Sequence, residues 1–594
     1  MSYQAKKLIN DPRDVVTEYI EGMVETYPLL QYLDGFPNIK VVLRADVLGS
    51  TYDKVAVISG GGSGHEPAHA GYVGEGMLTA AVCGDVFTSP HVDAILAAIR
   101  AVTGPKGCLL IVKNYTGDRL NFGLAAEEAK SEGYNVEMVI VGDDCALPPP
   151  RGVAGRRGLA GTILVHKVAG AAAAAGLSLT DVTAEAKHAS EIVGTMGVAF
   201  SVCTLPGHVT SDRLGPGLME LGLGIHGEPG AAVADLQTAD IVVSHVLKQI
   251  LSTETKYVPI TRGNRVVLMI NGLGSTPAME LMIAAGKAVP QLQLEHGLAI
   301  DRVYTGSFMT SLDMAGLSIS IMRADRIILQ RLDAPTKAPF WPVSVEGDRP
   351  PAKIPIPLPP SKIETNVELF AKPQELGEQG CILEVAIRAA ANEIISLRDQ
   401  LNEWDSKVGD GDCGSTMFRG ATAIMEDMKK CYPLNDAART VNEIGMSIRR
   451  VMGGTSGILY EILCKAAYAS LKDSPVITSK EWANALAAGI AAVSKYGGAG
   501  SGYRTMLDAL IPAASVLKER LDAGVDPVNA FVMSADAACS GAESTKNMQA
   551  QAGRSSYVSA EMLALVPDPG AMAVASWYRA AAIAVESRLR PSKD

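Results

Sequence analysis

Three carboxylates lie close together in residues 404–416, in a spacing that favours phosphate chemistry. Asp405, Asp410 and Asp412 fall within eight residues, and glycines stand between and just after them. Glycine allows sharp turns, so the three side chains can converge on one point. Converging carboxylates repel one another unless a cation lies among them, and Mg²⁺ takes oxygen ligands that it commonly shares with phosphates. The stretch therefore predicts a divalent metal site for a phosphorylated ligand.

The residues that follow favour this prediction over two alternatives. Ser415 and Thr416 come next, with hydroxyl and backbone N–H groups that suit phosphate oxygens. An acidic surface turn is the simplest alternative, and a Ca²⁺ loop is another. An EF-hand, however, needs a Glu at its twelfth position between two helices, and this stretch does not fit that pattern.

The distribution of histidine separates the chemistry of the two halves. All nine histidines lie between His65 and His296. Chemistry after His296 must therefore use carboxylates, hydroxyls, basic residues and metal, which is enough for the nucleotide side of a kinase. Covalent or acid–base chemistry belongs to the first half.

Three glycine-containing loops in the first half carry residues that could do this chemistry. His65 follows the glycine-rich residues 60–64 and could donate to a hydroxyl or titrate near neutral pH. Asp118 follows a glycine in the loop after Lys113 and could act as a general base. His226, in the loop 222–230, could act as an acid, a base or a nucleophile.

Each loop also has a purely structural alternative. His65 could cap a turn, Asp118 could form a surface ion pair with Arg119, and the His-Glu-Pro and His-Gly-Glu-Pro segments could both be turns alone. The glycines before His65 are too dense for a dinucleotide-binding fingerprint. Three such loops in one domain favour a binding site.

The elements that position these loops can be read from hydrophobic patterns. Short β-branched runs at 54–59, 108–113, 136–141 and 265–271 alternate with helical stretches such as 93–100 and 167–175. This alternation predicts βαβ units in largely parallel sheets. Ligands bind such sheets at the carboxyl ends of the strands, which is where the loops of His65 and Asp118 lie.

The second half has a different pattern. A proline-rich segment at 335–360 separates the halves and should be extended and stiff. Helix-like periodicity then occupies 382–401, 417–430, 438–452, 482–493 and 527–538, without interruption by strand-like segments. The sequence predicts a multidomain chain with an α/β domain at 1–335, a linker at 336–366 and an all-α domain at 367–594.

Composition narrows the class of protein. At 594 residues the chain is long enough for several hydrophobic cores. A formal net charge of -11 argues against nucleic acid or an acidic membrane as partner, and no apolar run approaches the ~20 residues that span a bilayer. The first residues lack the apolar segment of a signal peptide. Nine cysteines without a Cys-x-x-Cys pair suit free thiols, so we expect a cytoplasmic enzyme.

The motifs taken together resemble the dihydroxyacetone kinase family. The loops of His65, Asp118 and His226 are similar to its substrate-binding domain, and the stretch from Asp405 to Asp412 is similar to its nucleotide-binding domain. Further matching segments lie at 452–457, 505–510, 552–557 and 568–571. The motifs stand in the family's order on both sides of the proline-rich segment, as in the fused, ATP-dependent form that includes triokinase/FMN cyclases.

The resemblance implies roles for residues of the first domain. His226 would add through a ring nitrogen to the ketone carbon of dihydroxyacetone and hold it as a hemiaminal. Asp118 would accept the proton of the reacting hydroxyl, and His65 would orient the substrate. The residues matching the family's substrate contacts are Gly62, Ser63, Gly64 and Lys113.

The resemblance also implies a nucleotide site in the second domain, where helices form a barrel whose loops carry the metal. Asp405, Asp410 and Asp412 would hold two Mg²⁺ ions on the phosphates of ATP. The residues expected to line the nucleotide pocket are Cys413, Gly414, Ser415, Thr416, Thr455, Ser456, Gly497, Thr505, Met506, Arg554, Asp568, Pro569 and Gly570. A homodimer is the assembly that the family implies.

The leading expectation is phosphorylation of dihydroxyacetone and D-glyceraldehyde. A second is cleavage of FAD to AMP and cyclic FMN at the same nucleotide domain, with Mn²⁺ or Co²⁺ as alternative ions. A third is a non-catalytic regulator, against which the complete set of catalytic residues argues. Two positions depart from the family pattern: Tyr503 replaces an acidic residue, and Cys413 stands where some relatives have His.

Overall fold

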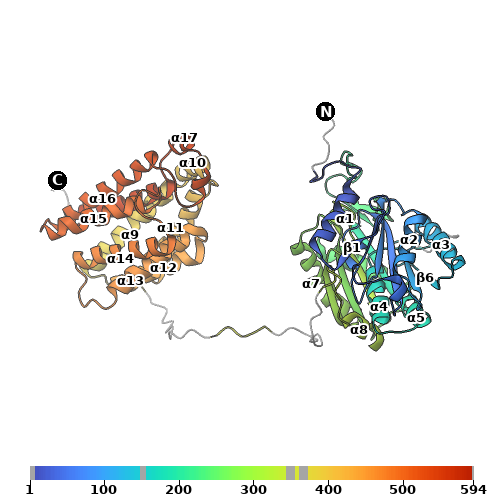
Figure 1. The fold of residues 1–594 in the computed structure, drawn as a ribbon. Coiled ribbons are helices and arrows are strands. Elements are labelled where there is room, and N and C mark those ends of the chain that lie inside the picture. The colour runs from blue at the N-terminus through green and yellow to red at the C-terminus, as the bar shows by residue number, and fades with distance from the viewer. Residues whose placement is uncertain (1–6, 148–154, 343–354, 360–371, 591–594) are drawn as a thin grey trace. The chain divides into compact units, whose positions relative to one another are not determined.

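The computed structural model describes residues 7–147, 155–342, 355–359 and 372–590. The chain divides into two compact units, Met1–Ile356 and Pro357–Asp594, each with its own hydrophobic cores (Figure 1). The first unit is built on two sheets and the second on helices. This division confirms the predicted fold class of an α/β domain followed by an all-α domain.

The first sheet holds the strands that lead into two of the predicted loops. Its order is β1-β2-β4-β3-β5-β6. β3 pairs in parallel with β4 and β5, and β5 pairs in parallel with β6, whereas β2 is antiparallel to both β1 and β4. The strands are β1 (Leu30–Tyr32), β2 (Val41–Arg44), β3 (Ala56–Ser63), β4 (Ala80–Val86), β5 (Cys108–Lys113) and β6 (Val136–Val141).

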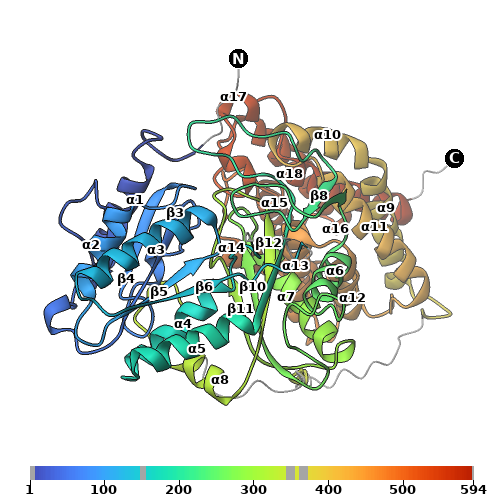
Figure 2. The same ribbon diagram turned by 90° about the vertical axis from the view of Figure 1, so that its right-hand side faces the viewer.

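Helices cover both faces of this sheet because alternate strand residues point to opposite sides (Figures 1 and 2). Ile58 and Leu110 pack in one core with helices α2 (Val92–Val102) and α3 (Thr116–Ser131). Their neighbours Val57 and Leu109 belong to a second core on the opposite face. The helices that contribute to that second core are α1 (Val15–Thr26), α4 (Thr162–Ala174), α5 (Leu179–Glu191) and α8 (Arg326–Asp333).

The second sheet differs from the expected parallel arrangement. Its order is β11-β10-β12-β7-β8-β9; β10 pairs in parallel with β11, and the pairs β10–β12, β12–β7, β7–β8 and β8–β9 are antiparallel. Parallel neighbours need a long crossover connection. The connection from Gly306 to Gly316 is short and carries no helix, so β12 runs against β10 and β11. The strands and helices are β7 (Val193–Ala199), β8 (Leu218–Leu221), β9 (Ala232–Asp235), β10 (Arg265–Gly272), β11 (Ala299–Gly306), β12 (Gly316–Arg323), α6 (Ala239–Ile250) and α7 (Ala278–Leu294).

The second unit is helical throughout its described residues. Its largest core includes Leu401, Met417, Leu463, Leu510 and Tyr578. The single helix predicted at 382–401 is divided at Leu397 into α9 and α10. The helices are α9 (Glu378–Ser396), α10 (Arg398–Val408), α11 (Cys413–Lys430), α12 (Ala437–Val451), α13 (Gly454–Leu471), α14 (Ser479–Gly497), α15 (Leu507–Asp522), α16 (Pro527–Ser544), α17 (Ala560–Leu563) and α18 (Pro569–Leu589).

The start of the expected linker packs against the first unit. The Thr336 hydroxyl donates to the carbonyl of Glu75 at 2.7 Å, and the buried ring of Trp341 lies 4.9 Å from that of Tyr304. Residues 355–359 are exposed and belong to no helix or strand. The rest of the linker, 343–354 and 360–366, lies outside the described residues. None of the helices in the described part of the chain combines the length and hydropathy that a bilayer crossing requires.

Candidate functional site

The two histidines of the first unit that sequence singled out lie against each other. His65 follows β3 and His226 follows β8, and their Nε2 atoms are 3.2 Å apart. The Nδ1 atom of His65 lies 2.8 Å from the carbonyl oxygen of Thr310, which can only accept. His65 therefore carries its proton on Nδ1 when neutral, and its bare Nε2 faces His226. Two residues 161 positions apart in the sequence thus lie in direct contact.

Burial keeps His65 neutral. Its side chain has no solvent exposure, and burial lowers the pKa of His65 well below its ordinary value. The nearby charge of Lys113 and the imidazole of His226 lower that pKa further. His65 is therefore suited to accept a proton briefly and to release it at once.

Two aromatic rings enclose the histidine pair. The Phe87 ring stacks on His65 at 5.1 Å between centroids and meets His226 edge-on at 5.0 Å. The Tyr115 ring meets His226 edge-on at 4.8 Å. Phe87 has φ 55°, which is uncommon for a residue with a side chain and marks local strain of the kind found at functional sites. These rings leave His226 only partly exposed, at 25% of its side chain.

Lys113 and Asp118 place two charged groups near His65. Lys113 ends β5 and is fully buried, and its Nζ atom has no hydrogen-bond partner among the residues that the structure describes. Burial lowers the pKa of Lys113, against the opposing charge of Asp118. A Cβ on Gly61 would lie 3.4 Å from Nζ of Lys113 and 3.5 Å from Oδ2 of Asp118, so the glycine leaves room beside both charged groups.

Asp118 is a buried carboxylate and not part of a surface ion pair. It lies in the first turn of α3 with 4% exposure, and Ser89 donates its hydroxyl to Oδ1. Arg119 is exposed and reaches Asn114 instead, with Nη1 3.3 Å from its amide oxygen. The Oδ2 atom of Asp118 is left facing Gly61 and Lys113.

The predicted metal ligands of the second unit converge as expected. Ligand oxygens of Asp405, Asp410 and Asp412 all lie within 4.8 Å of one another. Asp405, near the end of α10, accepts the N–H groups of Asp412 and Cys413 at 2.9 and 3.0 Å, which closes the loop between α10 and α11. Gly411 has φ 78°, a conformation that glycine adopts without strain. An all-oxygen set at this spacing fits a hard divalent cation.

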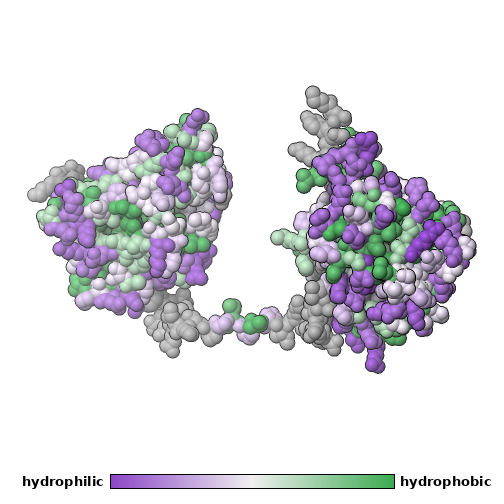
Figure 3. Space-filling model, viewed as in Figure 1, coloured by the Kyte–Doolittle hydropathy of each residue, from purple (hydrophilic) through white to green (hydrophobic). Residues whose placement is uncertain are grey.

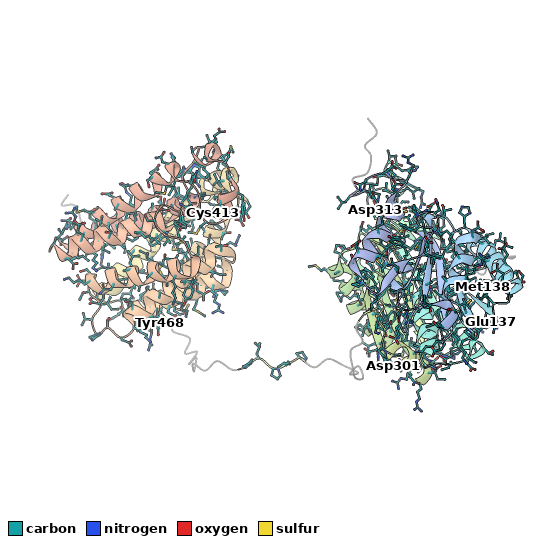
Figure 4. The ribbon with its side chains drawn as sticks, in the orientation of Figure 1. Glu137, Met138, Asp301, Asp313, Cys413 and Tyr468 are labelled. Carbon is teal, nitrogen blue, oxygen red and sulfur yellow. The ribbon has the colours of Figure 1, made fainter. Side chains whose placement is uncertain are left out.

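A fourth carboxylate adds to the charge at this end of the unit. Asp568 caps α18, where its Oδ1 accepts the N–H of Ala571 at 2.8 Å. Burial and the charges of Asp508 and Asp405 raise the pKa of Asp568 to about 6, against the opposing effects of Ala571 and Arg504. Figure 4 labels Cys413 at the start of α11 and Tyr468 near the end of α13.

The other expected nucleotide residues lie at helix ends. Gly414, Ser415 and Thr416 form the first turn of α11, where Asn402 and Ser415 exchange two hydrogen bonds of 2.9 Å. Arg419 joins α11 to the loop between α12 and α13 by donating to Thr416 Oγ1 and to the carbonyl of Met452, both at 3.0 Å. The remaining positions are Thr455 and Ser456 in the first turn of α13, Gly497 at the end of α14, Thr505 and Met506 before α15, and Pro569 and Gly570 at the start of α18. The side chain of Arg554 lies outside the described atoms.

The helical unit also contains a large apolar cavity of about 570 Å³. Ile387, Ile424, Leu463, Phe531 and Trp577 are among its lining residues. Figure 3 shows a green, apolar area bordered by polar residues on the viewed face of this unit. The helices therefore enclose space that their own side chains do not fill.

Comparisons with known proteins agree with this architecture. A Dak1 domain model matches residues 21–340, and a DAK2 domain model matches residues 407–582. The chain belongs to the dihydroxyacetone kinase family. It is 78% identical over 590 residues to a Solanum lycopersicum protein named "Putative 3,4-dihydroxy-2-butanone kinase", covering 99% of both chains. It is 41% identical to the Homo sapiens triokinase/FMN cyclase, covering 97% of this chain and 98% of that one.

The fold of the family has been solved with a nucleotide analogue. The dihydroxyacetone kinase of C. freundii in complex with AMP-PNP and Mg²⁺ superposes with a TM-score of 0.74 and 39% identity. The match covers 98% of this chain and 99% of that chain. The likeness therefore extends over both units and not over one domain alone.

Several residues of these sites carry no signal in the sequence. Phe87 and Tyr115 are isolated aromatics whose contacts with His226 depend on folding. Arg504, with 1% exposure and φ 60°, donates to the carbonyls of Thr545, Leu563 and Val566. Its neighbour Tyr503, which departs from the family pattern, accepts the N–H of Gln551 through its carbonyl at 3.2 Å, a backbone contact that any side chain would permit.

Proposed function

We propose that this protein is an ATP-dependent kinase that phosphorylates a terminal hydroxyl of a short hydroxy-carbonyl compound, namely dihydroxyacetone and D-glyceraldehyde. The observation that carries this proposal is the 3.2 Å contact between His65 and His226, with the charge of Lys113 acting on His65 and Asp118 beside Lys113 near Gly61. The names of the relatives support it, because dihydroxyacetone and 3,4-dihydroxy-2-butanone both have a ketone beside a hydroxyl-bearing carbon. A histidine pair that reacts with the carbonyl group suits all short hydroxy-carbonyl compounds of this kind.

The histidine pair can attach such a substrate with a balanced transfer of protons. The Nε2 proton of His226 passes to the bare Nε2 of His65, 3.2 Å away. The freed lone pair of His226 forms a bond to the carbonyl carbon, and the carbonyl π electrons move to oxygen. His65 then returns the proton to that oxygen, which gives a neutral hydroxyl. The product is a hemiaminal, and His65 ends as it began.

The tether would place the reacting hydroxyl for transfer. A covalently held substrate loses translational freedom before the chemical step, which lowers the entropy cost of alignment. Asp118, oriented by the Ser89 hydroxyl, would accept the hydroxyl proton, and the Lys113 ammonium would bind substrate oxygens. Glycerol has no carbonyl and cannot be held in this way.

The nucleotide side of the proposal rests on the second unit. Asp405, Asp410 and Asp412 would hold two Mg²⁺ ions, and the first turns of α11 and α13 would direct N–H groups toward phosphates. The bound ions would neutralise charge on the transferring phosphoryl group. The C. freundii relative, solved with AMP-PNP and Mg²⁺, supports ATP and Mg²⁺ as the nucleotide and the ion. We also propose that the protein forms the homodimer that the family resemblance implies.

The test is Mg²⁺- and ATP-dependent phosphorylation of dihydroxyacetone by the full chain, with glycerol as the comparison substrate. We expect wild-type activity on dihydroxyacetone and none on glycerol, with complete loss of activity in both His226→Ala and Asp410→Ala. Equal activity on glycerol, or full activity of His226→Ala, would overturn the tethered mechanism. Retained activity in Asp410→Ala would contradict the assignment of Asp410 as a metal ligand.

A second activity is favoured by the triokinase/FMN cyclase relatives. The Homo sapiens protein of that name is 41% identical over nearly the whole chain. Cleavage of FAD to AMP and cyclic FMN would use the same carboxylate cluster, with Mn²⁺ or Co²⁺ as alternative ions. Since the tether plays no part in that reaction, His226→Ala should release AMP from FAD as fast as wild type, and Asp410→Ala should not.

A further inference from the structure

A carboxylate lies behind His226, on the side opposite His65. Oε2 of Glu228 is 3.7 Å from Nδ1 of His226, an ion-pair distance, and it accepts the backbone N–H of His226 at 2.9 Å. Both ring nitrogens of His226 therefore face acceptors, with Nε2 toward His65 and Nδ1 toward Glu228. Glu228 belongs to the His-Gly-Glu-Pro segment, for which a structural turn was the alternative interpretation from sequence.

Glu228 is itself held in place from two sides. Nη1 of Arg157 is 3.6 Å from Oε1, and the same guanidinium pairs with the buried Asp144 at 2.6 Å and donates to the Gly222 carbonyl at 2.7 Å. Gly224 lies flat against the carboxyl group, since a Cβ there would fall 1.8 Å from Cδ of Glu228. The loop thus has a glycine where the carboxylate needs room.

We propose that Glu228 is a positioning residue for His226: it keeps a proton on Nδ1, so that Nε2 is the nitrogen that adds to the substrate carbonyl, and it stabilises the positive ring of the adduct. This inference rests on the proposed hemiaminal and adds Glu228 to the residues that act in its formation. Arg157 and Gly224 act through Glu228, by fixing its carboxylate beside the ring.

The charge balance of the addition explains why a carboxylate is needed there. A His226 ring with a single proton would hold it on Nε2, toward the bare Nε2 of His65, and transfer of that proton to His65 would leave the ring with none. With Glu228 ionised, the ring carries a second proton on Nδ1. The Nε2 proton passes to His65, Nε2 forms the bond to the carbonyl carbon, and His65 returns the proton to the carbonyl oxygen, while Nδ1 keeps its own proton. The ring of the product is an N-alkylated imidazolium, and its charge is matched by the carboxylate 3.7 Å away.

The electrostatic surroundings keep Glu228 ionised. Burial by itself raises the pKa of Glu228, but its contact with His226 and the charge of Arg157 lower it to about 2. The other ionisable groups that face this region are His65, Lys113, Tyr115 and Cys203. The pKa of His65 and that of Lys113 are lowered, and the pKa of Tyr115 and that of Cys203 are raised, so Glu228 supplies the negative charge at the ring.

The test measures the adduct directly, without ATP or metal. Dihydroxyacetone labelled with ¹³C at its carbonyl carbon is added to the full chain, and NMR distinguishes a bound tetrahedral carbon from the free ketone. We expect a tetrahedral signal with wild type and a reduction of adduct formation on the order of 10- to 100-fold with Glu228→Gln, by analogy with other partners that orient histidines. Gln keeps the shape and can still accept the His226 N–H, but it lacks the charge.

Glu220→Gln is the matched control. Glu220 accepts the N–H of Gly230 in the same loop at 2.7 Å, and no contact joins it to the His226 ring in the described structure. It should leave adduct formation at the wild-type level, while Gly224→Ala, which displaces the Glu228 carboxylate, should lower adduct formation as Glu228→Gln does. Thermal unfolding of each variant distinguishes loss of the charge from loss of the fold.

A measurement on wild type needs no variant. In chain labelled with ¹⁵N-histidine, Nδ1 of His226 should carry a proton in the adduct, and a bare Nδ1 would overturn the proposal. An undiminished adduct in a folded Glu228→Gln would overturn it as well. Absence of a tetrahedral signal in wild type would instead refute the hemiaminal itself, so the two failures are distinguishable.

Discussion

Asp568 provides a stability prediction whose magnitude depends on pH. Its carboxyl group caps α18 and lies near the charges of Asp508 and Asp405, and its pKa is raised from 3.8 to about 6. An acid with a raised pKa binds its proton more tightly in the folded state, so stability falls as pH rises between these two values and stays lower above them. We expect Asp568→Asn to remove this loss, because Asn can still cap the helix.

The magnitude follows from the shift. Each pKa unit corresponds to about 1.4 kcal/mol, so the shift from 3.8 to about 6 costs about 3 kcal/mol at pH well above 6. Near pH 4 the shifted group is protonated and the ordinary group is only about half ionised, so the cost falls below about 1 kcal/mol. Asp568→Asn should therefore stabilise the chain clearly at alkaline pH and only slightly at acid pH.

The assay is thermal and urea unfolding of the full chain in chelator, for wild type and Asp568→Asn. For a unit of this size, 1 kcal/mol corresponds to about 2–4 °C in Tm. The helical unit has no histidine, so a stability change near pH 6 in that unit reports a carboxyl group with a raised pKa. Lys480→Gln, at an exposed surface position of the same unit, is the control and should show no pH-dependent gain.

The reasoning would be refuted by a gain that is the same near pH 4 and near pH 8, since that result would place the effect in packing or capping and not in ionisation. A loss of stability at alkaline pH would refute it more directly. It would mean that the ionised carboxylate of Asp568 stabilises the fold without metal, contrary to its raised pKa.

Two further predictions concern the second unit. Asp410→Asn should stabilise the chain in chelator by about 1 kcal/mol, because it relieves repulsion among carboxylates within 4.8 Å of one another. It should also reduce the rise in Tm that Mg²⁺ causes. An unchanged response of Tm to Mg²⁺ would contradict the metal site. Arg504→Met should destabilise the unit by about 3–5 kcal/mol in urea unfolding, since three carbonyls lose their donor. Arg504→Lys should recover only part of this loss of stability. A cost below about 1 kcal/mol for Arg504→Met would contradict the role of Arg504 as the donor to these carbonyls.

Local pattern was sufficient to predict much of this protein. The strands around 54–59, 108–113, 136–141 and 265–271 were predictable because short β-branched runs bounded by glycine favour buried strands. The all-α character of the second unit follows from helical periodicity without strand-like segments. The carboxylate cluster was predictable because its three members are so close in sequence that one glycine-rich turn brings them together.

Sequence also indicated which histidines matter, but not how they meet. His65 and His226 each stand in a glycine-containing loop, and the family resemblance assigned both to one site. Their 3.2 Å contact depends on two different sheets, and the antiparallel pairing of the second sheet was not expected. Strand direction depends on how a chain crosses over or returns, and residue pattern alone does not encode that choice.

Only the tertiary structure decided the contacts between distant segments. Arg157 reaches Glu228, Phe87 stacks on His65, and Arg504 joins three carbonyls of the helical unit. None of these has a local signature, because each side chain is fixed by packing and by a partner far along the chain. Sequence by itself determined the kinds of chemistry present, since residue types and short spacings are local, whereas the protonation and orientation of each group depend on burial and neighbours that exist only after folding.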